Sequence, residues 1–128
     1  MTKRPLVGLA LMLGLAAAWA QEPGPLVEAG CVAENACRDD VRVLDIRSRK
    51  IDGESRAEYV QAHIPCAVHS DYVQGGWRAK QGDVPGVLPS VAELEGLIGR
   101  LGIDASTRVV IAPLGDHAKS MASAARLY

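Results

Sequence analysis

Val-Arg-Val-Leu-Asp-Ile-Arg, residues 41–47, is the stretch that decides the fold. It is a β-branched, mostly apolar run between Asp39-Asp40 and Ser48-Arg-Lys. An apolar run of this length without strict alternation predicts a strand that is mostly buried, as in a parallel sheet covered by helices. We expect Asp45 and Arg47 at the carboxyl end of this strand, where open α/β sheets bind their ligands.

Helices and strands alternate on the C-terminal side of this stretch. Two capping boxes, Ser55 with Glu58 and Ser90 with Glu93, each predict the start of a helix. The predicted elements are a helix over about 56–62, a very short strand over 67–69, a helix over 91–101 that Gly102 ends, a strand over 108–112 and a helix from Ala118. This order predicts an α/β domain with a parallel sheet and helices on both faces.

Three loops lie at the carboxyl ends of these strands: 47–55, 69–89 and 113–117. Residues 70–89 form a long connection that is rich in glycine and proline, with Trp77 as its only large anchor. Connections of this length inside a domain are uncommon and often functional. One interpretation is that its polar residues, Asp71, Arg78 and Lys80, contact a substrate or a further domain. The other is a solvated loop that one tryptophan anchors.

The N-terminus predicts a secretory signal peptide over residues 1–20. Lys3 and Arg4 precede an uncharged apolar run from Leu6 to Ala17, and Ala18-Trp19-Ala20 is a small-x-small cleavage site. We expect cleavage after Ala20, a mature domain over 21–128 and a periplasmic or secreted location. An uncleaved anchor is the alternative, but the run is shorter than the ~20 residues that span a bilayer.

Composition argues against nucleic acid as a partner. The chain has 14 Lys and Arg against 15 Asp and Glu, a net charge of −1. Loss of Lys3 and Arg4 with the signal lowers the net charge to −3, and no basic run remains. We also expect no membrane association after the signal is cleaved. Because the chain contains no Phe, its core must be built from Leu, Val, Ile and Ala.

Export would carry three cysteines, Cys31, Cys37 and Cys66, into an oxidising compartment where one pair can form a disulfide. Cys31 and Cys37 are the nearest pair. However, the stretch 28–36 can form a short helix, and cysteines six residues apart on a helix lie about 9 Å apart along its axis. A disulfide cannot span that separation. Either the helix is interrupted or this pair is not bridged, and the sequence leaves the pairing open.

Six short motifs follow one another along the mature chain. They are Val-Arg-Val-Leu-Asp-Ile-Arg (41–47), Glu58-Tyr59, His63-Ile-Pro-Cys-Ala-Val-His69 with Asp71, Leu88-Pro-Ser90, Leu101-Gly-Ile-Asp104 with Thr107-Arg-Val-Val110, and Ala124-Ala-Arg126. In this order they resemble the pattern of rhodanese-like sulfurtransferases over residues 26–128. The long 70–89 connection and the Leu-Pro-Ser helix start resemble the first domain of the two-domain thiosulfate and 3-mercaptopyruvate sulfurtransferases.

The resemblance implies that a cysteine thiolate takes sulfur from a small anionic donor, holds it as a persulfide and passes it to a thiol or cyanide acceptor. It implies no metal or other cofactor. In the family, this cysteine opens the loop between the strand and helix that correspond to 108–112 and Ala118 onward. Here that loop reads Pro113, Leu114, Gly115, Asp116 and His117, without a cysteine. Proline cannot donate an N–H, and Asp116 adds negative charge where a persulfide needs positive potential.

This degenerate loop matches the non-catalytic first domain of the two-domain members. The resemblance therefore implies that the catalytic cysteine lies in a second rhodanese domain beyond Tyr128. The chain stops inside its last helix, so we expect an incomplete sheet without its closing strand. In mercaptopyruvate-type relatives, a histidine and an acid that match His63 and Glu54 assist the chemistry of the other domain. A histidine that braces the turn is the favoured interpretation of His63.

The segment His63-x2-Cys66-x2-His69 also suggests a metal site, because imidazole and thiolate are common zinc and copper ligands. We favour a structural thiol, because the segment crosses from a helix end to a strand and nothing places the three side chains together. A nucleophilic Cys66 is disfavoured because it follows a helix C-terminus, where the dipole raises the pKa of a thiol. Cys66 replaces the glycine that the family usually carries.

Asp45 and Arg47 have two interpretations as well. They could face a ligand at the strand end, but an internal ion pair is the favoured interpretation because structural charge networks are commoner than catalytic ones.

For the whole chain, the alternative to a sulfurtransferase half is a free-standing, catalytically inactive rhodanese-like binding module. That product would expose an unpaired sheet edge and apolar surface, which is an aggregation hazard.

Overall fold

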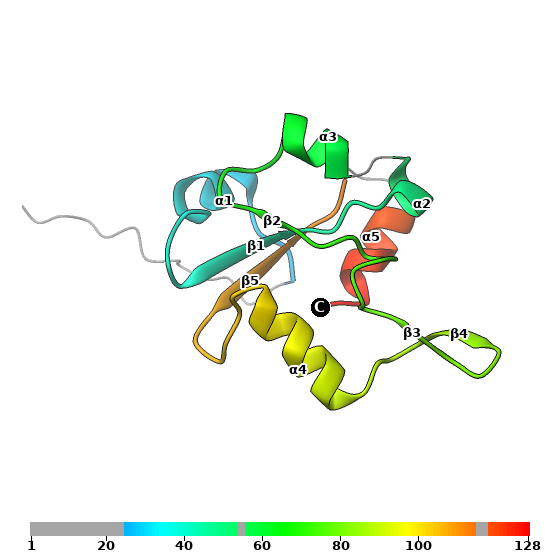
Figure 1. Ribbon diagram of the computed structural model, residues 1–128. Coiled ribbons are helices and arrows are strands. Elements are labelled where there is room, and N and C mark those ends of the chain that lie inside the picture. Colours follow the sequence, from blue (N-terminus) through cyan, green and yellow to red (C-terminus); the bar gives the residue numbers. More distant parts are fainter. Residues whose placement is uncertain (1–24, 54–55, 115–117) are drawn as a thin grey trace, which may run out of the picture.

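The computed structural model describes residues 25–53, 56–114 and 118–128. In these ranges the chain is a mixed α/β fold around a small parallel sheet of order β2-β1-β5 (Figure 1). The predicted α/β class and parallel sheet are confirmed. The elements are α1 (Ala29–Asn35), β1 (Val41–Asp45), α2 (Arg49–Asp52), α3 (Arg56–Gln61), β2 (Val68–His69), β3 (Ala79–Gln81), β4 (Val84–Val87), α4 (Val91–Arg100), β5 (Arg108–Ala112) and α5 (Ala118–Ala125).

Strand β1 is the centre of the sheet and is buried on both faces. Val41 and Val43 point into one apolar cluster, while Leu44 and the following Ile46 point into another. Val43 has no exposed surface at all. Successive side chains of a strand point to opposite faces, so a strand between two layers must be apolar almost throughout. The predicted burial of 41–47 follows from this central position.

Helices cover both faces of the sheet, as predicted. Val32 of α1 and Ile64, just after α3, pack into the cluster of Val41 and Val43. Leu97 of α4 and Ala124 of α5 belong to the cluster of Leu44. Figure 1 shows α4 on one side of the strands and α1 and α3 on the other. The carboxyl ends of β1 and β2 therefore lie under α3.

Helix α4 begins where its capping box predicts. The Ser90 hydroxyl accepts a hydrogen bond from the Glu93 amide at 3.3 Å, and the Glu93 carboxylate accepts one from the Ser90 amide at 2.8 Å. The helix ends at Arg100, and Gly102 has a φ of 72°, which only glycine adopts without strain.

Two loop predictions were wrong in part. The 47–55 loop contains α2, a single turn that Gly53 ends with a φ of 76°. The 70–89 connection contains a hairpin in which β3 and β4 pair antiparallel, with Gln81 opposite Val84. Gly82 and Asp83 are therefore a two-residue turn, a dipeptide that is typical of hairpins. Both faces of this hairpin are largely exposed, so it lacks the alternation that predicts a strand.

Strand β5 pairs with β1 alone in the part of the chain that the structure describes. Beside this edge lies an apolar groove of about 360 Å³, lined by residues that include Trp77, Val109 and Leu127. Val109 is 39% exposed, although the apolar sequence of β5 is typical of a strand inside a sheet. Within the described residues, no other strand pairs with this edge.

Candidate functional site

The polar side chains that the sequence singled out meet at the carboxyl ends of β1 and β2. Asp45, the last residue of β1, lies opposite His69, the last residue of β2, in parallel register. Partner residues in a parallel pair point to the same face, which here is the face under α3. Tyr59 of α3 covers His69, with ring centroids 5.1 Å apart. Two strand ends and one short helix thus define the candidate site.

Asp45 and Arg47 form a buried ion pair two residues apart. The Arg47 guanidinium donates from Nη2 to Asp45 Oδ2 at 2.7 Å and from Nε to Oδ1 at 2.9 Å. The Arg47 side chain is only 10% exposed and the Asp45 side chain 6%. Asp45 Oδ1 also accepts the Arg47 backbone amide at 3.1 Å, which holds the chain as it leaves β1. The carboxylate therefore orients the guanidinium and the strand exit together.

Tyr59 is the centre of the cluster. Its ring stacks on both imidazoles, with centroids 4.1 Å from His63 and 5.1 Å from His69, and the Arg47 guanidinium carbon lies 6.0 Å from the ring centroid. Its hydroxyl donates a 2.6 Å hydrogen bond to the carbonyl of Ala67. Stacked aromatic and cation–π contacts of this kind are individually worth about 1 kcal/mol. Tyr59 therefore ties α3 to β2 and to the end of β1.

The two histidines have defined hydrogen bonds. His69 Nε2 lies 3.0 Å from the carbonyl oxygen of Arg47, and His63 Nδ1 lies 2.7 Å from the carbonyl oxygen of Tyr59. Because a carbonyl only accepts, these nitrogens carry the protons. His63 thus caps the C-terminal end of α3, which is a bracing contact. The His63 residue is exposed.

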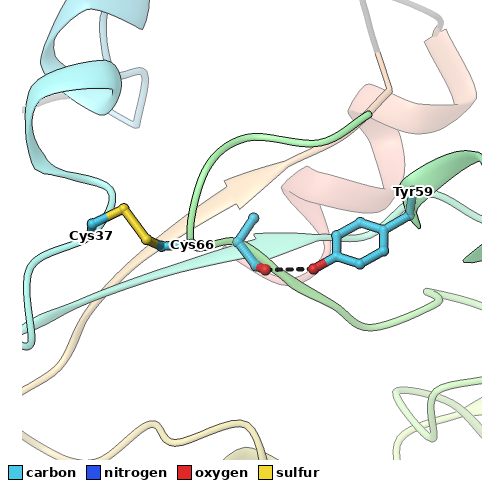
Figure 2. Close-up of a disulfide and its surroundings, with 4 residues drawn as sticks. Cys37, Tyr59 and Cys66 are labelled. Carbon is cyan, nitrogen blue, oxygen red and sulfur yellow. Dashed lines mark hydrogen bonds between the residues drawn. A yellow bond between two sulfur atoms is a disulfide. The ribbon is translucent and has the colours of Figure 1, made fainter. Parts of the chain in front are cut away.

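A disulfide adjoins this cluster. Cys37, just after α1, is bonded to Cys66, 29 residues later, with their Cα atoms 5.2 Å apart. Figure 2 shows the bridge between Cys37 and Cys66 near Tyr59. Ala67 follows Cys66 in the chain, and its carbonyl accepts the Tyr59 hydroxyl. Helix α1 is intact, and Cys31 within it is a free thiol. The structure thus decides the open question of pairing against Cys31–Cys37.

The disulfide also corrects the interpretation of Cys66 as a structural thiol. Its sulfur is committed to Cys37 and is not a thiolate that could bind a metal or attack a donor. Among the described residues, no group of three His, Cys, Asp or Glu side chains is arranged to hold a metal ion. The arrangement His63-x2-Cys66-x2-His69 is instead a turn in which both histidines contact Tyr59.

The loop after β5 opens with Pro113 and Leu114, both partly buried. Gly115, Asp116 and His117 lie outside the described residues, as do the signal segment 1–20 and the auxiliary candidate Glu54 with the capping Ser55. The sequence of this loop contains no cysteine. The strand-to-helix position where the resemblance places a nucleophile therefore has no thiol of its own.

The polar residues of the 70–89 connection are used internally. Asp71 Oδ1 accepts the amides of Val73 and Gln74 at 2.7 and 2.8 Å, and buried Trp77 donates from its indole to Ser70 Oγ at 2.9 Å. The Arg78 guanidinium lies 5.6 Å from the centre of the Tyr72 ring. Lys80 lies 3.8 Å from Asp83 in the exposed hairpin. The interpretation of a loop anchored by one tryptophan fits these contacts.

Sequence reasoning did not place two members of the site. Tyr59 entered only as part of a motif, since no spacing rule indicated that its ring would lie between two histidines. The pairing of Cys37 with Cys66 was one of three that the sequence left open, because the approach of residues 29 positions apart is visible only in the fold. One signal was present: a proline, as in Pro65-Cys66, favours the first central position of a tight turn.

No protein-family model, curated protein or solved structure matches this chain. In the described ranges, each helix is too short or too polar to cross a bilayer.

Proposed function

We propose that this chain is a rhodanese-like module of an exported sulfurtransferase, in which a cysteine outside residues 1–128 carries the persulfide. The observation that supports this most directly is the junction from β5 to α5. It has the strand–loop–helix order of a persulfide-binding loop, yet it opens with Pro113 and its sequence has no cysteine.

The positions of the three cysteines also support a persulfide cysteine outside this chain. Sulfur transfer needs a thiolate at a helix N-terminus or beside a cation. Cys37 and Cys66 are bonded to one another. Cys31 is the third residue of α1 and is partly buried, with its sulfur 3.9 Å from the side-chain amide nitrogen of Asn35. None of the three occupies a carboxyl end of the parallel sheet, so we expect the chemistry to need another thiol.

The open edge of β5 supports a neighbouring structural unit. The exposed Val109 and the apolar groove beside it are where a further strand and helix of a rhodanese fold would pack. A strand edge of this kind is normally covered or paired in a finished domain. We propose that the continuation of the sheet and a second rhodanese domain, with its bound sulfur donor and its thiol or cyanide acceptor, complete the enzyme.

An exported location is part of the same proposal. A disulfide between Cys37 and Cys66 persists in oxidising compartments and is rare in reducing ones. Together with the expected cleavage after Ala20, it supports a periplasmic or secreted protein.

A free-standing, inactive binding module is the second candidate. The buried Asp45–Arg47 pair and the stacked histidines favour it, because these groups are largely engaged with one another and form a stable scaffold. The two candidates differ in one respect: only the first requires a persulfide cysteine elsewhere in the native protein.

The test is the transfer of sulfur from thiosulfate to cyanide by the purified chain. We expect no thiocyanate above a protein-free blank, because no thiol lies at the sheet's carboxyl ends. The matched controls are Cys31→Ser and Cys66→Ser. Turnover by the chain that disappears in either variant would contradict the proposal.

A further inference from the structure

Cys66 occupies a backbone position that favours glycine. Ile64, Pro65, Cys66 and Ala67 form a tight turn, closed by a 3.0 Å hydrogen bond from the Ala67 amide to the Ile64 carbonyl. Cys66 has a φ of 62° and is the only non-glycine residue with a positive φ among those described. A turn with proline first and a positive φ second is the type that selects glycine. The cysteine therefore holds this position at a conformational cost.

The bridge that results lies at the surface. Both Cys37 and Cys66 are exposed. An attacking thiolate must reach a sulfur along the line of the S–S bond, so exposure governs the rate of exchange. Exposed bridges are also the more easily reduced class.

The turn is mechanically joined to the candidate site. Ala67 follows Cys66 directly, and its carbonyl accepts the hydroxyl of Tyr59 at 2.6 Å. Tyr59 in turn stacks on His63 and His69. Opening the bridge would release the turn from the end of α1 while leaving β2 paired with β1 through the Ser70 amide and the Asp45 carbonyl, 2.9 Å apart.

We propose that Cys37–Cys66 is a thiol-exchange site, whose partner is a dithiol reductant and whose opening loosens the turn that holds Tyr59. One thiolate of the dithiol attacks a bridge sulfur, the S–S bond breaks, and the released cysteine takes a proton. The second thiolate then attacks the mixed disulfide. The bridge gains two electrons and two protons to become two thiols, and the dithiol becomes its own disulfide. This inference does not depend on the proposed sulfurtransferase function.

The first experiment measures the rate at which dithiothreitol reduces the oxidised protein. Free thiols are trapped with a maleimide at a series of times, and the labelled protein is quantified by mass spectrometry. The rate is compared in native buffer and in denaturing urea. An exchangeable surface bridge is reduced in the folded state, so we expect the native rate to lie within about tenfold of the denatured rate. A native rate more than about a thousandfold lower, as for a bridge that opens only through unfolding, would overturn the proposal.

The second experiment measures amide hydrogen exchange in the oxidised and reduced protein. After reduction we expect the Ala67 amide to lose its protection and exchange within about tenfold of an unstructured peptide. The Ser70 amide, which stays in the sheet, should remain protected by at least about a hundredfold. If the Ala67 and Ser70 amides lost protection equally, the bridge would stabilise the whole fold and not the turn alone. If the Ala67 amide stayed protected, the bridge would not restrain the turn. Either result contradicts the proposed local release.

Cys31→Ser is the matched control for both experiments. It removes the free thiol and leaves the bridge in place, so both readouts should be unchanged. A change in the reduction rate of more than about tenfold would mean that Cys31 takes part in the exchange, and the two-cysteine mechanism would be wrong.

Discussion

Asp45 and Arg47 show how charge is used at the end of the central strand. Both side chains are nearly buried, and each satisfies the other through more than one hydrogen bond. A buried pair of this kind contributes little net stability against apolar residues of the same size, but removing one partner leaves a charge without compensation. The pair therefore fixes the geometry of the site more than it strengthens the fold.

Asp45→Asn should destabilise the protein by about 3 kcal/mol, because Arg47 would keep its charge in a buried place without a carboxylate. Urea unfolding followed by circular dichroism measures the change. Asp40→Asn is the control, since the Arg38–Asp40 pair is exposed and its loss should leave the free energy of unfolding unchanged. Equal stability of Asp45→Asn and the unmodified protein would contradict the importance of the buried pair.

The positive φ of Cys66 leads to a second prediction at the residue scale. In a Cys37→Ser background, where no bridge can form, Cys66→Gly should raise the free energy of unfolding by about 1 kcal/mol, because glycine adopts this conformation without steric conflict. The comparison uses urea unfolding of the single and double variants. Cys66→Ala in the same background keeps the side-chain carbon and should give no such gain; a gain of equal size there would assign the effect to the lost thiol.

At the scale of elements, helix α4 owes its start to a reciprocal cap. The hydrogen bonds that the Glu93 carboxylate accepts from the Ser90 hydroxyl and amide hold the pKa of Glu93 below its ordinary value of 4.5. A lowered pKa in the folded state means that the ionised carboxylate stabilises the fold. That stabilisation is complete above the ordinary pKa and is lost as the pH falls through the lower, folded value.

The stability difference between the unmodified protein and Glu93→Gln should therefore shrink as the pH is lowered from 7 to about 3. Urea unfolding at a series of pH values measures this difference. The control is the same comparison in a Ser90→Ala background, which removes one partner of the carboxylate and should reduce the pH dependence. If this difference in the free energy of unfolding stayed constant with pH, the ionised Glu93 carboxylate would not stabilise the fold.

The elements that could be predicted from sequence are those with a strong local pattern. Helix α4 has a capping box and helical spacing, and β1 and β5 are apolar runs of strand length. Helix α2 and the hairpin of β3 and β4 were missed, because one turn of helix and strands of three or four residues carry no period to detect. The only local signals of these turns were Gly53 and Gly82, which adopt positive φ.

The site could be predicted only in part for a different reason. Asp45 and Arg47 are two residues apart at a strand end, so their pairing was visible in the sequence. The contact of Tyr59 with His69 and the bond of Cys37 to Cys66 depend on where α3 returns the chain to β2. Such contacts arise from the packing of helix on sheet, and no local rule contains them.

At the scale of the whole molecule, a parallel sheet with helices on both faces carries a polar cluster at its carboxyl ends. Among the residues that the structure describes, no strand pairs with the outer edge of β5. The cluster has a tyrosine, two histidines and a buried ion pair, but no free thiol. We propose that this module supports sulfur transfer by a cysteine that lies elsewhere in the native protein.

The measurement that tests this claim most directly is persulfide mapping. The native protein, isolated from the extracytoplasmic fraction of its source, is loaded with thiosulfate, digested without reductant and searched by mass spectrometry for a cysteine that has gained one sulfur atom. We predict that this peptide lies outside residues 1–128, with Cys37 and Cys66 still joined. A persulfide on Cys31, Cys37 or Cys66, or no persulfide on any cysteine of the protein, would contradict it.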